Sequence, residues 1–178
     1  AVTVRTAGGH GSGFYVSADG YVITNAHVVG NAKRVLVISG DAEHYAEIVR
    51  KDLGRDVALL KIINDVTVKP LSISQDVVRI GETVYVIGTP LSEELSFSVT
   101  RGIISGKRES NGMPLLQTDA AINHGNSGGP VVNEYGNVIA ISVSGIFSKD
   151  GGSLNTNFLI PIDSALVALG IHVSKNRL

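Results

Sequence analysis

Valine and isoleucine recur along the chain in short runs, and pairs of turn-forming residues separate these runs. Such pairs join antiparallel strands, because glycine and asparagine tolerate the positive φ angles that tight hairpins need. The pattern is typical of many short strands rather than of long helices. The turn signals stand at Asp19-Gly20, Asn111-Gly112, Gly136-Asn137 and Asp150-Gly151-Gly152.

Two sets of six strands are predicted between these turns. The first set lies near residues 2–7, 11–17, 21–26, 34–39, 44–51 and 57–63. The second set lies near residues 83–88, 97–108, 115–118, 130–133, 138–144 and 155–160. A polar stretch near 64–80 separates the sets. We therefore expect an all-β fold of two antiparallel barrels, an N-terminal one over residues 1–75 and a C-terminal one over 76–178.

One segment, residues 163–169, is predicted to be helical. Ala165, Leu166 and Leu169 share one face of such a helix. Asp163 can cap its start, and Gly170 can end it. The predicted helix is short and follows the last strand of the second set.

Composition narrows the class of protein further. Hydrophobic residues make up 43% of the 178 residues, which is enough for a real core, and no apolar run approaches the roughly 18 residues of a spanning helix. The net charge is −1 and the basic residues are scattered, so nothing indicates a nucleic-acid partner or an anionic membrane surface. Cysteine is absent, which excludes disulfides, thiolate catalysis and cysteine-based zinc sites. Because no His/Asp/Glu group has ligand spacing, we expect neither a metal nor a cofactor.

The most informative segment for chemistry is Gly125-Asn126-Ser127-Gly128-Gly129-Pro130. A serine hydroxyl is a poor nucleophile unless a base removes its proton and the developing oxyanion is stabilised. The glycines allow a tight turn around Ser127 and allow the amides of Gly125 and Ser127 to point into one pocket. Taken alone, the segment also fits an ordinary surface turn.

His27 is the candidate base, at the end of the apolar run Tyr21-Val22-Ile23-Thr24-Asn25-Ala26. We expect it at the end of a strand, where the imidazole would be held rigidly at a barrel edge, although an isolated histidine there is more often structural. The other four histidines lack such a setting; they are His10, His44, His124 and His172.

Asp56 is the candidate orienting acid, because it directly precedes the buried run Val57-Ala58-Leu59-Leu60-Lys61-Ile62. A shielded carboxylate on a fixed backbone suits a group that holds one tautomer of a histidine. A strand-capping aspartate is the alternative. Asp52 lies in a charged run and is expected to be solvated, and Asp119 is expected to make structural hydrogen bonds.

The order His, Asp, Ser along the chain is that of the chymotrypsin arrangement. His27 and Asp56 fall in the first set of strands and Ser127 in the second. A cleft between two barrels would bring the three together. Three signals that are weak one by one therefore agree on a nucleophilic serine site.

The chain closely resembles the trypsin-like proteases of the HtrA (Deg) family over residues 11 to 161. The resemblance implies a double-barrel fold, ATP-independent endopeptidase activity on polypeptides, a cell-envelope or periplasmic location and the triad His27, Asp56 and Ser127. It also implies an oxyanion hole made by the amides of Gly125, Asn126 and Ser127. The matching segments are Gly11-Ser12-Gly13-Phe14, Asp19-Gly20 through Val28-Val29, Asp56-Val57-Ala58-Leu59-Leu60-Lys61, Ile87-Gly88-Thr89-Pro90, Ser98-Val99-Thr100-Arg101-Gly102-Ile103-Ile104-Ser105 and Gln117-Thr118-Asp119-Ala120-Ala121-Ile122-Asn123.

Three features depart from the family pattern. No PDZ domain follows the protease segment in this sequence, so the sequence is either a protease domain cut from a longer protein or a member of a short branch without PDZ. The first seven residues lack the aromatic anchors that usually build the family's trimer, so they do not support oligomerisation. His124 stands where the family often has Pro or Arg; it is either exposed or involved in pH sensing or substrate contact.

Asn126 precedes the nucleophile, where digestive trypsin-like enzymes have an aspartate that pairs with a newly cleaved N-terminal amine. A neutral amide cannot make that ion pair. We therefore expect that trimming of the N-terminus does not activate the enzyme. Ordering of the loops 106–114, 121–126 and 145–154 would control it instead.

Specificity is predicted from Ala121, six positions before the nucleophile, where trypsins hold an acidic residue. No carboxylate stands there to pair with a substrate Lys or Arg. With Ile122 and the strand of Ile141, Ser142, Val143 and Ser144 as expected walls, we predict small or medium aliphatic P1 residues. The backbone near 142–145 would pair with the substrate as an added strand.

The main rival interpretation is a catalytically silent homologue that binds peptides or acts as a chaperone-like module. The intact serine segment, histidine and aspartate argue against it. An esterase or another acyl-transfer activity at the same site is a further alternative. Reaction with a fluorophosphonate probe separates a working hydrolase from a binder.

Overall fold

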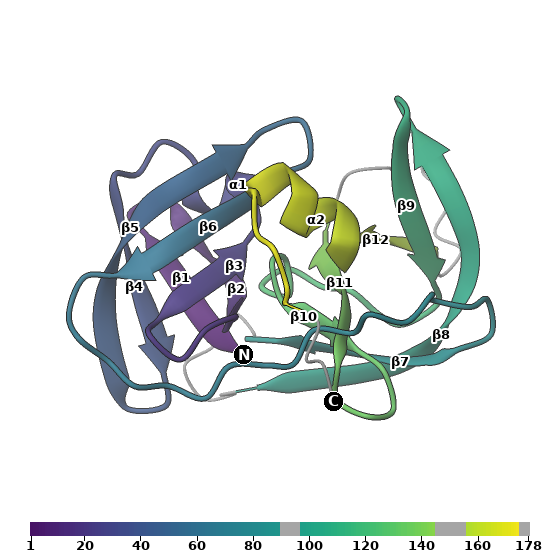
Figure 1. The fold of residues 1–178 in the computed structure, drawn as a ribbon, viewed down its shortest axis with the longest axis horizontal. Coiled ribbons are helices and arrows are strands. Elements are labelled where there is room, and N and C mark those ends of the chain that lie inside the picture. The colour runs from purple at the N-terminus through teal and green to yellow at the C-terminus, as the bar shows by residue number, and fades with distance from the viewer. Residues whose placement is uncertain (90–96, 145–155, 175–178) are drawn as a thin grey trace.

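The computed structural model describes residues 1–89, 97–144 and 156–174. Its named strands form two closed antiparallel barrels of six strands each, which lie side by side (Figure 1). This is the trypsin-like double barrel that the sequence predicts. Within the described residues, no helix is both long and apolar enough to cross a membrane.

The first barrel has the strand order β1-β2-β3-β6-β5-β4. Its interior is filled mainly by branched aliphatic side chains, among them the fully buried Val4, Val22, Val37 and Leu60. Branched side chains pack well on a pleated surface, which is why these short runs form strands. The strands are β1 (Val2–Thr6), β2 (Gly9–Tyr15), β3 (Tyr21–Thr24), β4 (Arg34–Ser39), β5 (Ala42–Asp52) and β6 (Val57–Ile62).

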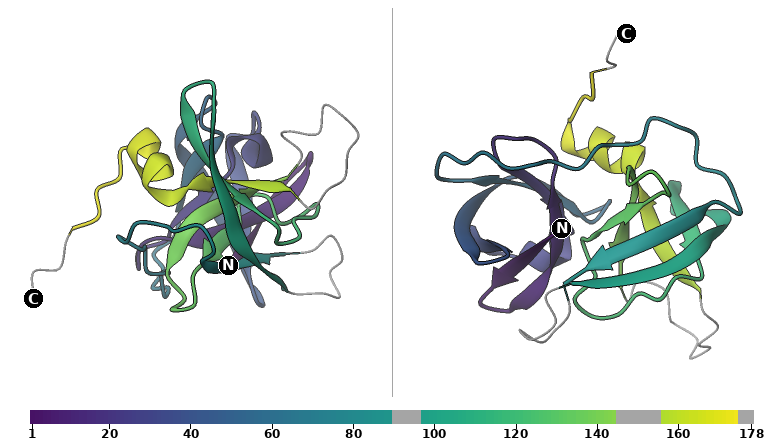
Figure 2. Two further views of the ribbon diagram at one scale, coloured as in Figure 1. Left: turned by 90° about the vertical axis from the view of Figure 1, so that its right-hand side faces the viewer. Right: turned by 90° about the horizontal axis from the view of Figure 1, so that it is seen from below.

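The second barrel has the strand order β10-β11-β12-β9-β8-β7. Its interior includes the fully buried Val84, Val86, Ile104 and Leu159. The two barrels are separate closed sheets, as the view from below shows (Figure 2). The strands are β7 (Thr83–Gly88), β8 (Ser98–Ser110), β9 (Met113–Thr118), β10 (Pro130–Val132), β11 (Val138–Val143) and β12 (Asn157–Pro161).

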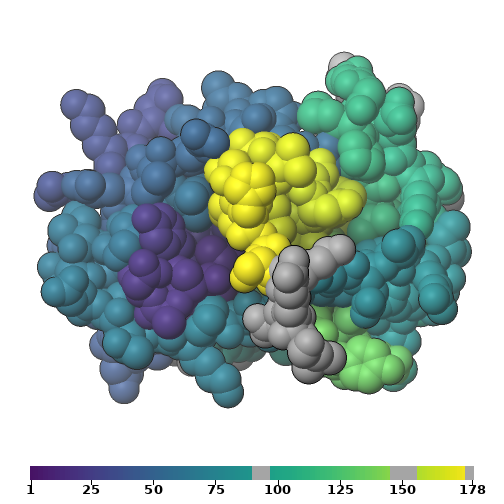
Figure 3. All heavy atoms as spheres, in the orientation of Figure 1, coloured from purple at the N-terminus to yellow at the C-terminus, as the bar shows by residue number. Residues whose placement is uncertain are grey.

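A third apolar cluster joins the barrels and holds helix α2 (Ile162–Leu169) against both of them. Phe14 and Val57 come from the first barrel, and Ile141 comes from the second. The helix contributes the face that the sequence predicts, with Ala165, Leu166 and Leu169 buried. In the space-filling view α2 lies at the surface over the junction (Figure 3). The contact between barrels is therefore a hydrophobic core of its own, which fixes the position of residues on either side of it.

The segment of residues 63–82 leads from one barrel to the other and hydrogen-bonds to both. The amide of Leu71 donates to the carbonyl of Tyr15 in the first barrel at 3.0 Å. The amide of Ser74 donates to the carbonyl of Val138 in the second at 2.9 Å. The expected division after residue 75 falls within this connecting segment.

Each of the strands predicted from the sequence has a counterpart within a few residues. The Asn111-Gly112 turn has positive φ at both residues, 51° and 75°, as a type I′ hairpin requires. The turn at Asp150-Gly151-Gly152 lies outside the described residues. Gly170 ends α2 in the left-handed conformation, with φ of 66°, as predicted.

The predicted start of α2 was wrong. Its N-cap is Pro161, which makes no side-chain capping bond, and the helix begins at Ile162. Asp163 therefore lies in the first turn, where its carboxylate accepts a hydrogen bond from the amide of Ser164 at 2.8 Å. A carboxylate in this turn still interacts favourably with the helix dipole.

Candidate active site

Asp56 is the last residue of the four-residue turn that joins β5 to β6, and its φ is 60°. Two side chains of the same barrel hold this turn. Asn25 Nδ2 donates to the Asp56 carbonyl at 2.9 Å, and Asp52 Oδ1 accepts from the amide of Arg55 at 2.7 Å. Asp52 is therefore not simply solvated, as its charged sequence context predicted; its carboxylate closes the turn that carries Asp56.

His27 lies in the one-turn helix α1 (Ala26–Val29), not at the end of a strand as predicted, because β3 already ends at Thr24. Its Nδ1 is 2.7 Å from Asp56 Oδ2, and its backbone amide donates to Asp56 Oδ1 at 2.9 Å. Both carboxylate oxygens are thus used by one residue. The His27 side chain is 47% exposed and that of Asp56 only 16%, so the imidazole edge remains open while the carboxylate is shielded.

Ser127 lies in the loop between β9 and β10 and is 4% exposed. The loop is held at its backbone: the Ser127 carbonyl accepts from the amide of Ser12 at 2.8 Å, and Gly128 donates to the carbonyl of Ser142 at 2.9 Å. Gly128 has φ of 84°, and a β-carbon there would overlap the Ser12 carbonyl oxygen and Thr24 Oγ1. Glycine is needed at this position both for its backbone conformation and for the close approach of the first barrel.

Ser12 is a buried link between the barrels that sequence reasoning noticed only as part of a matching segment. Its hydroxyl donates to the carbonyl of Gly125 at 2.5 Å and accepts from the amide of Thr89 at 2.8 Å. Thr24 Oγ1 donates to the Ser12 carbonyl at 2.7 Å. One fully buried serine of β2 therefore contacts two loops of the second barrel, including the loop of Ser127.

The hydroxyl of Ser127 interacts with Ser144, at the end of β11. The amide of Ser144 donates to Ser127 Oγ at 3.0 Å, and the two hydroxyls are themselves hydrogen-bonded. Among the described residues, no hydrogen bond joins Ser127 Oγ to His27 Nε2. Both side chains nevertheless line the same open pocket of about 630 Å³, together with His10 and His124.

The amides of Gly125 and Ser127 have no hydrogen-bond acceptor among the described residues. The amide of Asn126 differs, because it donates to the carbonyl of Asn123 at 3.1 Å. Asn126 itself is 2% exposed, and its carbonyl accepts from Ser142 Oγ at 2.5 Å. In this conformation Asn126 is a structural member of the loop and not a free donor.

The residues predicted to form the specificity pocket are only partly placed as expected. The side chains of Ile141 and Val143 belong to the buried cluster between the barrels, so they do not form walls open to a substrate. Ser142 is also fully buried. Ala121 is exposed and Ile122 is half-buried, and residues 145–154 lie outside the described residues. The side chains of β11 are buried on both faces, because one face packs in the interior of the second barrel and the other in the cluster between the barrels.

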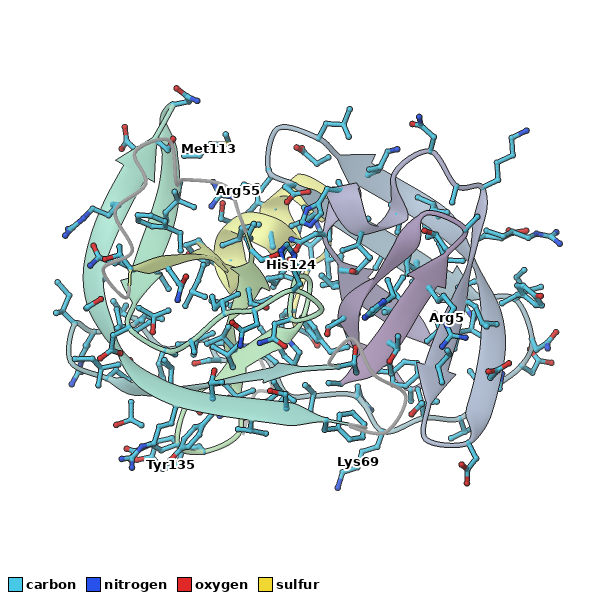
Figure 4. The ribbon with its side chains drawn as sticks, turned by 180° about the vertical axis from the view of Figure 1, so that it is seen from behind. Arg5, Arg55, Lys69, Met113, His124 and Tyr135 are labelled. Atoms are coloured by element: carbon cyan, nitrogen blue, oxygen red, sulfur yellow. The ribbon has the colours of Figure 1, made fainter. Side chains whose placement is uncertain are left out.

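Other candidates from the sequence take structural places. Asp119 Oδ1 accepts from the amide of Ile103 at 2.8 Å, which confirms its structural role. His124 is exposed beside the pocket and lies near the junction of the barrels (Figure 4). Within the described residues, no group of three His, Asp or Glu side chains is arranged to hold a metal ion.

Comparison with known families accounts for this geometry. The sequence profile of the trypsin-like peptidase domain matches residues 11–141, most of the chain. The chain belongs to this family. This trypsin-like peptidase domain is 45% identical over 169 residues to the "Probable periplasmic serine endoprotease DegP-like" of Pseudomonas putida strain F1, and 44% identical over 162 residues to that of Hahella chejuensis. The matches cover 91% and 88% of the chain but 34% of each relative, so the domain spans about a third of their length.

Solved structures agree with the family assignment. The HtrA-type protease AlgW with a tripeptide superposes on the trypsin-like peptidase domain with a TM-score of 0.82 at 36% identity. That match covers 95% of the domain and 58% of the AlgW chain. AlgW with a decapeptide gives a TM-score of 0.78 at 38% identity, covering 90% of the domain and 50% of that chain. The resemblance to HtrA proteases that the sequence motifs carry is thus confirmed.

Proposed function

We propose that this chain is the protease domain of a periplasmic serine endopeptidase that cleaves polypeptides through an acyl-enzyme on Ser127. One observation carries the proposal: the Asp56 carboxylate holds both the backbone and the imidazole of His27, and that imidazole shares a pocket with Ser127. The family, and the periplasmic endoproteases among the relatives, support the reaction class and the location.

In the proposed reaction, Asp56 keeps the proton of His27 on Nδ1 and leaves Nε2 free to accept one. Ser127 Oγ attacks the scissile carbonyl carbon while its proton passes to His27 Nε2. The imidazolium that forms is stabilised by the carboxylate at 2.7 Å. It then donates the proton to the leaving amine as the C–N bond breaks. Water hydrolyses the remaining ester by the same proton path in reverse, which regenerates the serine.

The oxyanion of the tetrahedral intermediate is proposed to bind the amides of Gly125 and Ser127. Preorganised backbone donors of this kind are worth about 2.7–4 kcal/mol each in transition-state stabilisation. For attack, the hydroxyl of Ser127 has to leave Ser144 and turn to His27. The arrangement with Ser144 is therefore proposed as a resting state, which an incoming substrate displaces.

Small or medium aliphatic P1 residues are proposed because Ala121 supplies no carboxylate where a basic side chain would need one. Digestion of casein, followed by mass-spectrometric mapping of the cleaved bonds, tests this proposal. Cleavage mainly after Val, Ala or Leu is expected. A profile dominated by Lys or Arg at P1 would contradict it.

Labelling by a fluorophosphonate probe tests the enzymatic function itself, with Ser127→Ala as the control. Labelling of the parent chain and none of the variant is the expected result. The rival is a peptide-binding module without turnover, which the engagement of Ser127 by Ser144 also fits. Absence of labelling, together with binding of unfolded polypeptide by the same chain, would favour that rival.

A further inference from the structure

Arg55 is a buried cation directly beside the candidate acid Asp56. The residue is 7% exposed. Among the described residues, no carboxylate lies within ion-pair distance of its guanidinium. Its Nε is buried without a hydrogen-bond partner. Burial lowers the pKa of Arg55, an effect that the more distant carboxylates of Asp163 and Asp52 partly offset.

The guanidinium spans the junction of the barrels. Arg55 Nη2 donates to the carbonyl oxygen of Pro114, near the start of β9 in the second barrel. Asp163, in the first turn of α2, is close enough for its negative charge to act on the guanidinium. In the view from behind, Arg55 lies between the β8–β9 hairpin and α2 (Figure 4).

The strand that Arg55 contacts leads directly to the candidate nucleophile. β9 pairs with β8 on one side and with β12 on the other, and after Thr118 the chain enters the loop of Ser127. The bonds from Asn25 and Asp52 hold the Asp56 turn only to the first barrel. Arg55 is the member of this group that connects the turn to the second barrel.

Asp56 is a residue whose conformation needs such support. Its φ of 60° is disfavoured for a residue with a β-carbon, and such a conformation persists only when its surroundings over-determine it. A buried and incompletely paired cation is a poor way to stabilise a junction, because an apolar side chain of the same length avoids the cost of desolvation. What the guanidinium adds is a directed hydrogen bond across the two halves of the site.

We propose that Arg55 is a positioning residue that connects the turn bearing Asp56 to β9. This contact fixes the Asp56 carboxylate against His27 and holds both at a constant position relative to the loop of Ser127. The inference rests on the proposed protease function. It adds a residue that contacts neither the substrate nor the imidazole. Arg55 acts on the site through the backbone of the adjacent residue, Asp56.

The test compares Arg55→Met, which keeps length but loses the donors, with Arg55→Lys, which keeps the charge. Arg34→Met is the matched control, because Arg34 is in the same barrel and its side chain is 64% exposed. Three quantities are measured on the whole chain: kcat/KM on a peptide substrate, the melting temperature, and the low-field proton NMR signal of His27 Nδ1–H. That signal reports the hydrogen bond to Asp56 and needs no turnover.

For Arg55→Met, kcat/KM is expected to fall at least tenfold and the His27 Nδ1–H signal to shift or broaden. Arg55→Lys should recover part of both, and Arg34→Met should change neither. The proposal is overturned if folded Arg55→Met keeps kcat/KM within twofold of the parent. It is also overturned if activity or melting temperature falls while the His27 signal stays unchanged. If the parent chain is itself inactive, the proposed function fails, and the NMR comparison still decides the role of Arg55.

Discussion

Replacing Ser12 by alanine removes one buried oxygen atom and leaves the volume of the core almost unchanged. That oxygen donates to the carbonyl of Gly125 at 2.5 Å and accepts from the amide of Thr89 at 2.8 Å. Both partners belong to the second barrel and lie in fully or nearly fully buried surroundings. The substitution therefore tests the polar link between barrels separately from apolar packing.

Each buried backbone group that loses its partner costs about 1–3 kcal/mol. Thr89 Oγ1, which is 3.1 Å from Ser12 Oγ, can rotate to satisfy one of the two groups. One group is then left without a partner, and we expect the free energy of unfolding to fall by about 1–3 kcal/mol. The peptide group between Gly125 and Asn126 also loses the contact that fixes it, which loosens the loop that carries the proposed oxyanion donors. We therefore expect fluorophosphonate labelling to be about 10- to 100-fold slower. Because a tenfold change in rate is about 1.4 kcal/mol, this corresponds to about 1.4–2.8 kcal/mol of lost transition-state stabilisation.

Urea unfolding and the second-order rate of labelling measure the two effects on the same Ser12→Ala protein. Ser17→Ala is the matched control, since Ser17 is in a surface turn of the same barrel and its hydroxyl bonds Asp19 at 2.5 Å. That control should change stability by less than about 1 kcal/mol, because its bond to Asp19 is solvent-exposed and the bond that it accepts from the Tyr21 amide, at 3.2 Å, is only partly buried; labelling should be unchanged. The buried link is refuted if the free energy of unfolding of Ser12→Ala is within about 0.5 kcal/mol of the parent's and its labelling rate is the same. An ordinary surface substitution changes stability by about ±0.5 kcal/mol, which sets this threshold.

Three further predictions follow from the site. Ser144→Ala should raise the labelling rate several-fold, because it frees the hydroxyl of Ser127; an equal or lower rate would show that Ser144 does not restrain the nucleophile. Gly128→Ala should lower stability by about 2–4 kcal/mol through positive φ and overlap with the first barrel, whereas Gly112→Ala, where a β-carbon meets open space, should cost about 1–2 kcal/mol; thermal unfolding compares the two. Extending the N-terminus, or removing Ala1, which alone precedes β1, should leave peptide cleavage unchanged, because the neutral Asn126 side chain cannot form an ion pair with an amine; a large change in cleavage rate would refute this.

The strands and their turns could be predicted because their causes are local. The Asn111-Gly112 hairpin needs two positive φ angles, and the residue types that permit them are adjacent in the chain. The same holds for Gly170 at the end of α2. Two local interpretations failed for equally local reasons. A one-turn helix such as α1 is too short to produce a periodic pattern around His27, and Pro161 competes with Asp163 for the start of α2.

The sequence alone determined the architecture, and it supplied the residue types of the proposed serine site and the order in which they occur. Only the tertiary structure decided which groups touch. Ser12 reaches Gly125 across 113 residues, and Arg55 reaches Pro114 across 59. No periodicity in the sequence reveals either contact, because both form where two independently closed barrels meet. The engagement of Ser127 by Ser144, and the burial of Ile141 and Val143, likewise depend on how the barrels and the end of β11 pack against each other, which no run of neighbouring residues encodes.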